Sequence, residues 1–540
     1  MASSNHSKKP KKAFTPKLKQ ASSNSASPSF SIPIHRDLQL AAWLKPSFDT
    51  YFQLGLAFHN SGYPTEAKEN FVKALTYNPK SFEAQCNLAL ALKNEGDIEG
   101  AYQEFEKAYA FEHRVLSSAT ILDELIYLQH YQYPLNIEQQ MIILKRYDQL
   151  FEPRLDEPSR PKPQLKTPLR IGFVSGDLRE HVVAYFLENT LSQLRLDSEL
   201  SGQLELIAYS NTSTQDDYTF TLHEYFDQWY RVDSWTDDRL VDQIKRDRVD
   251  ILCDLSGHSR FNRLPVFAKR PAPLQISWMG YWASTGLSSM DYVLTDPVSV
   301  PEQEKQAFVE RVWYLPHLRY SFSIPKHAPE VSPPPCVQSQ QIVFGCYQNI
   351  AKINQAVLNC WFRILAASSD VRIRIQLSQL KNTGDRERFM AKLQQVGIDT
   401  VRIDLAAGMG YQDYLASYAN VDILLDTFPY PGGATTSEAL WMGVPTITLA
   451  QPSMLGRQGE ALMVNAGLSD WVARSEDEYV QKAIDWANAD TVRRRQLATL
   501  RQNMREQVKQ SPVFNAKQFA HDFVGAIYGI WQEKCAESVR

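Results

Sequence analysis

The stretch "DTFPYPGGATTSEALWMGVPTITL" at residues 426–449 predicts a strand, a sharp turn, a helix and a second strand. An apolar run at 421–425 enters it, and another at 446–449 closes it. Two prolines and two glycines break the chain between them, and Thr435 and Thr436 open the predicted helix. The turn is either a tight connection in which one threonine caps the helix or a phosphate cradle, because a helix N-terminus presents free N–H groups and partial positive charge.

Short apolar runs alternate with amphipathic helical stretches on both sides of this unit, which predicts parallel sheets covered by helices. The strands are expected at 169–174, 204–209, 249–255, 274–278, 342–345, 371–376, 401–405, 421–425 and 446–449. A Pro-rich break at 323–341 divides this region nearly in half. We therefore expect two Rossmann-like α/β domains, at 169–335 and 336–510, that face a cleft, with a C-terminal helix at 511–540 crossing back.

An internal repeat precedes these domains. Residues 48–81 align with residues 82–115 at an offset of 34, which is the tetratricopeptide period. Two repeats are too few to bury a solenoid core alone, so other helices of an all-α region at 35–151 should support them. The repeats are either a peptide-binding surface or a helical spacer, and a Pro- and charge-rich linker at 152–168 should separate them from the α/β domains.

Composition excludes several classes of protein. The charged fraction of 22% and the net charge of −4 give no reason to expect nucleic acid as a partner. No apolar run reaches the length of about eighteen residues that a membrane span requires. The six cysteines lack zinc spacing and are expected to be reduced thiols of a cytoplasmic protein. The Ser- and Lys-rich segment 1–34 is expected to be a disordered tail.

Polar and titratable residues follow several predicted strands, where ligands bind in such sheets. The first domain offers Asp177, His181, His258, Arg260 and Asn262, and the second offers Gln348, Asn349, Lys352, Thr435, Thr436 and Glu438. The sequence shows no cluster of metal ligands. A base, a fixed cation and helix N-termini suit a phosphorylated ligand with a nucleophile opposite it.

The region from residue 169 to 509 resembles the family of O-linked N-acetylglucosamine transferases and SPINDLY proteins. The resemblance is carried, in this order, by "LRIGFVSGDLREH", "RPAPLQISWMGYWASTG", "MDYVLTDPVSVP", "QNIAKIN" and "LDTFPYPGGATTSEALWMGVPTITL". It implies a GT-B-like pair of Rossmann-like domains, a nucleotide-sugar donor, inversion at the anomeric carbon, and no required metal or other cofactor.

The resemblance also implies roles for individual residues. His181 matches a histidine beside the acceptor hydroxyl, which acts as base or positions the acceptor. Lys352 matches the lysine that contacts the diphosphate and stabilises charge on the leaving nucleotide. The remaining donor-site residues are Gln348, Gly433, Thr435, Thr436 and Glu438, with Glu438 at the position that holds the ribose hydroxyls. Possible cleft residues are Asp177, Gly257, His258, Asn262, Tyr281 and Arg457.

Two positions depart from animal O-GlcNAc transferases. Ala434 replaces a histidine and Glu438 replaces an aspartate, which is closer to the SPINDLY branch. Plant SPINDLY uses GDP-fucose, whereas most of the family uses UDP-GlcNAc. The expected function is therefore O-glycosylation of Ser or Thr in intracellular proteins from UDP-GlcNAc, with protein O-fucosylation from GDP-fucose as the alternative. Acceptor proteins would bind the cleft and possibly the repeats. A non-catalytic tetratricopeptide scaffold and a transferase acting on small molecules or glycans also stay open.

Overall fold

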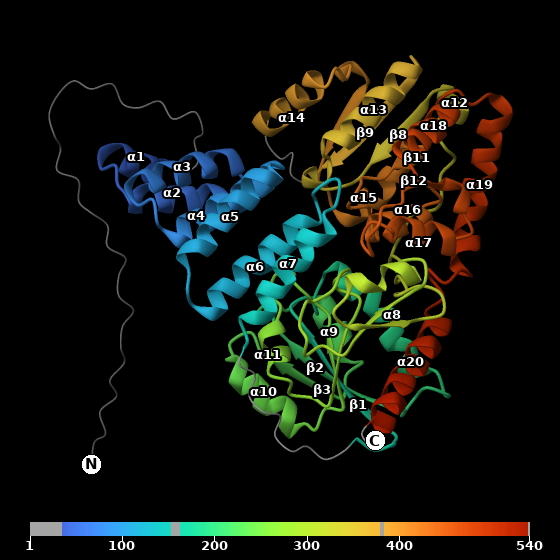
Figure 1. Ribbon diagram of the computed structural model, residues 1–540. Helices are drawn as coiled ribbons and strands as arrows, with labels where there is room; N and C mark the ends of the chain where they lie inside the picture. Colours follow the sequence, from blue (N-terminus) through green and yellow to red (C-terminus); the bar gives the residue numbers. More distant parts are fainter. Residues whose placement is uncertain (1–34, 153–162, 378–382, 538–540) are drawn as a thin grey trace, which may run out of the picture.

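The computed structural model describes residues 35–152, 163–377 and 383–537 (Figure 1). The chain forms a helical region and two stacked α/β domains. The expected tail at 1–34 and most of the expected linker, residues 153–162, lie outside the described residues.

The helical region packs as antiparallel pairs because small residues face large ones. Ala67 and Phe71 of the first repeat, and Ala101 and Phe105 of the second, are buried at 0–2% exposure. The helices are α1 (Arg36–Leu44), α2 (Phe48–Asn60), α3 (Pro64–Tyr77), α4 (Phe82–Glu95), α5 (Ile98–Phe111), α6 (Val115–Gln129) and α7 (Ile137–Gln149).

The first α/β domain contains a seven-stranded, all-parallel sheet in the order β3-β2-β1-β4-β5-β6-β7. Its strands are β1 (Leu169–Ser175), β2 (Leu204–Ser210), β3 (Gln228–Arg231), β4 (Ile251–Asp254), β5 (Leu274–Ser277), β6 (Tyr292–Thr295) and β7 (Arg311–Tyr314). Its helices are α8 (Val182–Leu196), α9 (Asp217–His223), α10 (Asp237–Arg246), α11 (Leu264–Ala268) and the 3-10 turn η1 (Glu302–Ala307).

The second domain repeats this plan with a six-stranded parallel sheet in the order β10-β9-β8-β11-β12-β13. Its strands are β8 (Ile342–Cys346), β9 (Val371–Leu377), β10 (Ile403–Ala407), β11 (Ile423–Leu425), β12 (Thr446–Leu449) and β13 (Val472–Ala473). Its helices are α12 (Cys336–Ser339), α13 (Gln355–Ala367), α14 (Thr383–Gln395), α15 (Tyr411–Ser417), α16 (Ala434–Trp441), α17 (Gln458–Asn465), α18 (Glu476–Ala487) and α19 (Thr491–Lys509), with 3-10 turns η2 (Ile350–Lys352), η3 (Thr400–Arg402), η4 (Tyr418–Asn420) and η5 (Ser469–Trp471).

Every strand predicted from the sequence is present, and β3, β6, β7 and β13 are additional. The predicted pair of parallel α/β domains with a tetratricopeptide-type helical region is confirmed. The last helix, α20 (Ala516–Glu537), returns to the first domain, where Phe523 stacks on Trp278 with ring centroids 4.5 Å apart (Figure 1). One continuous apolar core runs through both domains and this helix, so the two sheets hold a fixed relation.

Candidate functional site

The loop after β11 is organised by Asp426, a buried residue at the end of that strand. Its Oδ1 accepts hydrogen bonds from the backbone N–H groups of Gly432 (2.8 Å) and Thr427 (3.0 Å), and its Oδ2 accepts one from Thr448 Oγ1 (3.0 Å). Burial raises the pKa of Asp426 to about 6. Sequence reasoning missed this residue, although an aspartate directly after a buried strand was the available signal.

Lys352 lies over this loop at the end of η2. Its Nζ donates to Gln348 Oε1 at 3.0 Å and to the Pro431 carbonyl at 3.2 Å. Gln348 Nε2 in turn donates to Asp426 Oδ1 at 3.4 Å. The face of the Tyr430 ring, which was also missed, lies 4.0 Å from the Lys352 ammonium, within range of a cation–π contact. Burial lowers the pKa of Lys352 to about 8.

The residues that lead into α16 lie close to Gln348 and Lys352. A Cβ added to Gly432 would come within 2.5 Å of Gln348 Nε2 and 2.6 Å of Thr436 Oγ1, so only glycine allows this approach. Gly433 is the N-cap residue, and none of the described side chains caps the helix. Of the two alternatives for this turn, the one in which Thr435 or Thr436 is the N-cap is therefore excluded, since both threonines belong to the first helical turn. An uncapped helix start beside a buried ammonium is an arrangement that binds anions.

Glu438 is buried one turn further along α16. Its two carboxylate oxygens accept hydrogen bonds from the hydroxyls of Tyr411 and Tyr414, both at 3.0 Å. Burial raises the pKa of Glu438 to about 7. The Tyr411 ring also approaches Tyr185 on α8 of the first domain, with centroids 6.2 Å apart. The first turn of α8 thus faces Glu438 across the cleft.

His181 is the N-cap residue of α8. Its Nδ1 accepts a hydrogen bond from the Val183 N–H at 3.3 Å and lies 3.6 Å from Asp177 Oδ1. Burial lowers the pKa of His181 and raises that of Asp177. With Nδ1 accepting, the neutral ring carries its hydrogen on Nε2, so in this conformation the free edge of the ring is a donor rather than a base.

The candidates that follow β4 face α6 instead of Lys352. His258 is fully buried, with Nδ1 2.7 Å from Asp123 Oδ1 on α6 and Nε2 2.8 Å from the Thr285 carbonyl. Asn262 Nδ2 donates to Asp123 Oδ2 at 2.9 Å. Tyr281 bonds His130 at the end of α6 at 2.8 Å, and a Cβ at the tightly packed Gly257 would lie 2.3 Å from the Tyr281 side chain.

Arg457, at the N-cap position of α17, is held by carboxylates. It pairs with Glu304 of the first domain and, at 3.2 Å, with Glu460 of its own helix. This arrangement joins the two domains and satisfies the guanidinium without a phosphate. In the structure Arg457, one of the possible cleft residues, therefore contacts carboxylates on both sides of the domain boundary.

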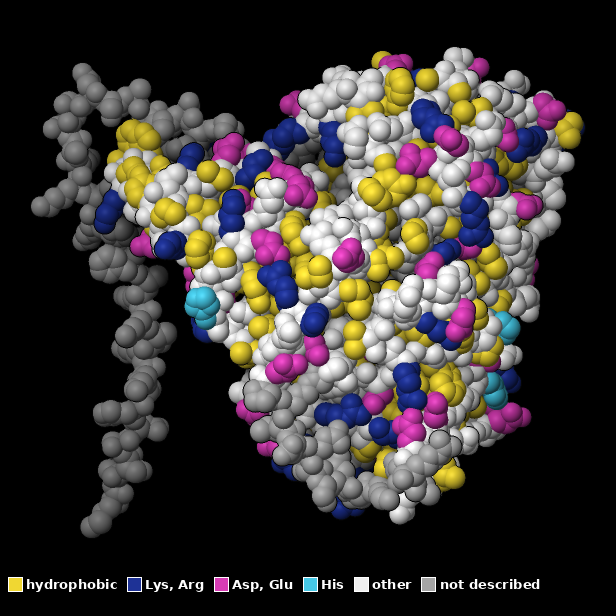
Figure 2. All heavy atoms as spheres, viewed as in Figure 1, with side chains coloured by type: hydrophobic (Ala, Val, Ile, Leu, Met, Phe, Trp, Pro, Cys, Tyr) yellow, Lys and Arg dark blue, Asp and Glu magenta, His cyan; other side chains and the backbone are white. Residues whose placement is uncertain are grey.

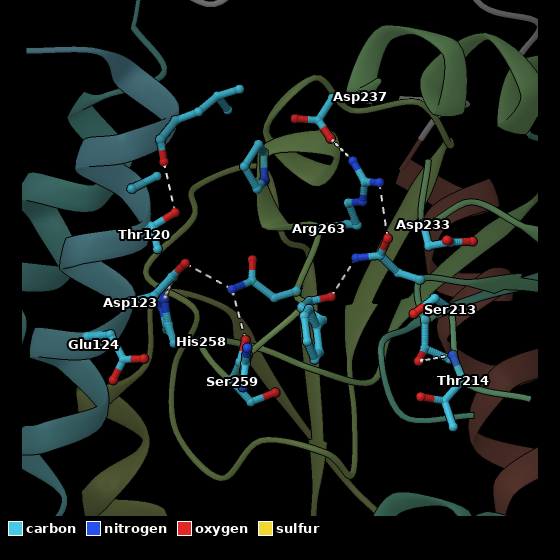
Figure 3. Close-up of a pocket in the computed structure, with 18 of the residues that line it drawn as sticks. Thr120, Asp123, Glu124, Ser213, Thr214, Asp233, Asp237, His258, Ser259 and Arg263 are labelled. Carbon is cyan, nitrogen blue, oxygen red and sulfur yellow. Dashed lines mark hydrogen bonds and ion pairs between the residues drawn. The ribbon is translucent and has the colours of Figure 1, made fainter. Parts of the chain in front are cut away.

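A polar pocket of about 780 Å³ opens between α6 and the loops after β1, β2 and β4 (Figure 3). Its lining combines hydroxyls and amides with charged groups of both signs, including Thr120, Ser213, Thr214, Asp233 and Arg179. Arg179 lies two residues before His181, so the pocket extends toward the start of α8. His258 and Asn262 form part of the wall through their contacts with Asp123.

Three further features of the molecule are its surface charge, the apolar character of its helices and its cysteines. Lysine and arginine side chains are interspersed with aspartate and glutamate over the face shown in Figure 2. None of the helices in the described ranges is long and apolar enough to cross a lipid bilayer. The six cysteines are all free thiols.

Comparison with known proteins provides independent evidence about the family of this chain. The family described as glycosyl transferase family 41 matches residues 128–330 and 336–523, and the tetratricopeptide repeat matches 48–81 and 82–111. An Arabidopsis thaliana protein named probable UDP-N-acetylglucosamine–peptide N-acetylglucosaminyltransferase SPINDLY is 33% identical over 377 residues, covering 69% of this chain and 40% of that protein. A second Arabidopsis relative, named SEC, is 24% identical over 68% of this chain. The chain spans about 40% of the length of these relatives.

A solved structure of a mutant O-GlcNAc transferase from Thermobaculum terrenum matches almost the whole chain. The TM-score is 0.84 at 29% identity, with 93% of this chain and 94% of that one covered. The GT-B-like arrangement expected from the sequence is therefore confirmed. Because the family match covers most of the chain, the protein belongs to glycosyl transferase family 41, the family of the O-GlcNAc transferases and SPINDLY proteins.

Proposed function

We propose that this protein transfers a sugar from a nucleotide donor, most favourably GlcNAc from UDP-GlcNAc, to Ser or Thr hydroxyls of polypeptides. One observation carries the proposal: Lys352, Gln348 and the uncapped start of α16 lie together beside Asp426. A diphosphate there would accept hydrogen bonds from the ammonium and the helix N–H groups. Glu438, further along α16, would accept hydrogen bonds from ribose hydroxyls.

The proposed reaction is an inverting displacement. The acceptor hydroxyl attacks the anomeric carbon from the face opposite the diphosphate and gives up its proton to water, the sugar–phosphate bond breaks, and the electron pair leaves with the nucleotide. Negative charge then builds on the diphosphate, where the Lys352 ammonium stabilises the transition state more than the ground state. The Nδ1 bond of His181 supports a role in which this side chain orients the acceptor through Nε2–H.

We assign acceptor recognition to the pocket between α6 and the first domain. Its mixed hydroxyl, amide and charged lining (Figure 3) fits a polar polypeptide segment, and Arg179 in that lining lies two residues before His181 in the chain. No metal takes part in the proposed step, since the ammonium and the helix start provide the positive charge.

The test is to incubate the purified chain with UDP-GlcNAc and, separately, with GDP-fucose, together with a mixture of Ser- and Thr-containing peptides, and to follow nucleotide release and peptide mass. UDP release with a mass gain of one N-acetylhexosamine supports the proposal. Fucose transfer would establish the alternative donor, which the SPINDLY-like Glu438 favours. Nucleotide binding without turnover would point to a scaffold, and sugar transfer to small molecules alone would contradict a polypeptide acceptor.

A further inference from the structure

We propose that the tetratricopeptide region is a working part of the donor site: the turn at Gly96 and the end of α6 together position Lys352. This inference rests on the proposed function, since it assumes that Lys352 contacts a nucleotide diphosphate. It assigns the second repeat a role in donor binding that is separate from any role in holding an acceptor.

The first contact is made by the turn that ends α4. Gly96 has φ +85°, and a Cβ built on it would lie 3.7 Å from the Ile350 carbonyl oxygen and 3.9 Å from Ala351 Cα. These two residues form η2 together with Lys352. The turn of the repeat therefore packs directly on the backbone that carries the ammonium.

The residue after Gly96 adds a charge to this contact. The pKa of Lys392 is lowered by burial, and the nearby carboxylate of Asp97 opposes that shift. Lys392 Nζ donates to the Ile353 carbonyl at 3.4 Å, at the other end of η2. The turn therefore packs on the start of η2 and acts electrostatically on a lysine that bonds the residue after its end.

The second contact reaches Lys352 through Tyr430. Tyr131, just after α6, packs its ring on that of Tyr430 with centroids 5.0 Å apart, and the Tyr127 hydroxyl lies 3.3 Å from the Tyr430 hydroxyl. The Tyr430 ring covers the Lys352 ammonium at 4.0 Å. Lys352 is thus held between η2, which Gly96 supports, and a ring that α6 supports.

The first repeat provides a built-in comparison. Gly62 occupies the equivalent turn with φ +79°, and no described heavy atom lies within 4 Å of a Cβ placed there. The two glycines share the same backbone conformation, and only the one in the second repeat touches the donor site. The same substitution, made separately at each glycine, distinguishes an effect on the repeat from an effect on Lys352.

The experiment replaces each glycine by asparagine, which tolerates positive φ better than most residues, and measures UDP binding to the full-length chain by calorimetry without an acceptor. Gly96→Asn should weaken UDP binding about tenfold, since small displacements of a positioned group have large effects, whereas Gly62→Asn should leave it unchanged. Both variants should melt at similar temperatures. Transfer assays should then show a raised KM for the nucleotide sugar in Gly96→Asn alone.

A second pair of variants guards against a folding defect at Gly96. Tyr131→Leu removes the ring that supports Tyr430 and should also weaken UDP binding, whereas Tyr109→Leu removes a ring of the same region that contacts Arg146 and should not. Equal UDP affinity in Gly96→Asn, Tyr131→Leu and the wild type would overturn the inference, as would equal weakening in both members of each pair. A wild-type chain that binds neither UDP nor GDP would contradict the proposed function itself.

Discussion

The two α/β domains each have a strand that is followed by a loop organised around a buried aspartate, but the two loops differ in the side chain that lies over them. β4 and β11 occupy the same place in their sheets, each directly beside the first strand of its domain. Each ends in a buried aspartate, Asp254 or Asp426, that accepts backbone N–H groups of the following loop and whose pKa burial raises to about 6. The loops therefore share one construction.

The difference lies in the cationic or titratable side chain above each loop. In the first domain His258 bonds a carboxylate and a carbonyl, and none of its polar atoms is left for a ligand. In the second domain Lys352 donates hydrogen bonds to an amide oxygen and a carbonyl; the Asp426 carboxylate acts on it electrostatically, but no carboxylate of the described residues forms a direct ion pair with it. His258, whose two ring nitrogens both have hydrogen-bond partners, is a saturated group and is expected to stabilise the fold. Lys352, which keeps hydrogen-bonding capacity, is available to bind a ligand.

The largest expected effect follows from removing the unsaturated charge. Lys352→Met should lower kcat/KM for sugar transfer by about 100- to 1000-fold, as the loss of a transition-state charge contact does elsewhere. Thermal stability should stay equal or rise, because a buried ammonium is removed. Lys269→Met, which breaks an exposed pair with Asp238, is the matched control. Full transfer by Lys352→Met at saturating donor would refute the assignment.

The saturated group should behave in the opposite way. His258→Ala leaves the Asp123 carboxylate partly buried without its partner and should reduce the free energy of unfolding by about 3–5 kcal/mol. UDP affinity of the folded fraction should not change. Denaturant titration measures the first quantity, and the double variant with Asp123→Ala should recover part of the stability. A loss of UDP affinity at unchanged stability would show that His258 belongs to the donor site.

Glu438 tests the ribose side of the donor site. Glu438→Gln keeps the size of the side chain but replaces one carboxylate oxygen by an NH₂ group, so UDP affinity should fall by about tenfold, the range of a charged hydrogen bond. Tyr411→Phe, which removes one of its two donors, should have a smaller effect. Calorimetry with UDP and with inorganic pyrophosphate distinguishes a lost contact to the ribose from a lost contact to the diphosphate. Pyrophosphate has no ribose and should bind both variants with wild-type affinity.

Donor binding is also expected to depend on pH. Burial lowers the pKa of Lys352 from its ordinary value of 10.5 to about 8, so its positive charge is present below that pH and is lost as the pH rises through it. UDP affinity should therefore fall by about tenfold between pH 7 and pH 9, following the protonated fraction. The same titration on Lys352→Met should be nearly flat. An unchanged affinity over this range in the wild type would contradict a role for the ammonium.

The sequence predicted most of the architecture because alternating apolar runs and a 34-residue repeat are local signals. It missed β3, β6 and β7, which are only four residues long, and β13, which is shorter still. It placed β10 two residues too early, at 401–405, because Val401 is apolar although it is 77% exposed in a 3-10 turn. Short strands depend on pairing with neighbours, which local patterns do not show.

Placing the site was harder, because it depends on contacts between distant segments. Lys352, Gln348 and Thr436 were expected to meet, and they do. The saturation of His258 by Asp123 could not be predicted, since the two lie 135 residues apart in sequence. The same holds for Tyr430, whose position over Lys352 joins loops of two strands.

A crystal structure with UDP bound tests the central claim most directly. The account predicts a diphosphate within hydrogen-bonding distance of Lys352 Nζ and the first N–H groups of α16, with the ribose toward Glu438. A nucleotide seated instead in the polar pocket beside Asp123, or against Arg457, would contradict it.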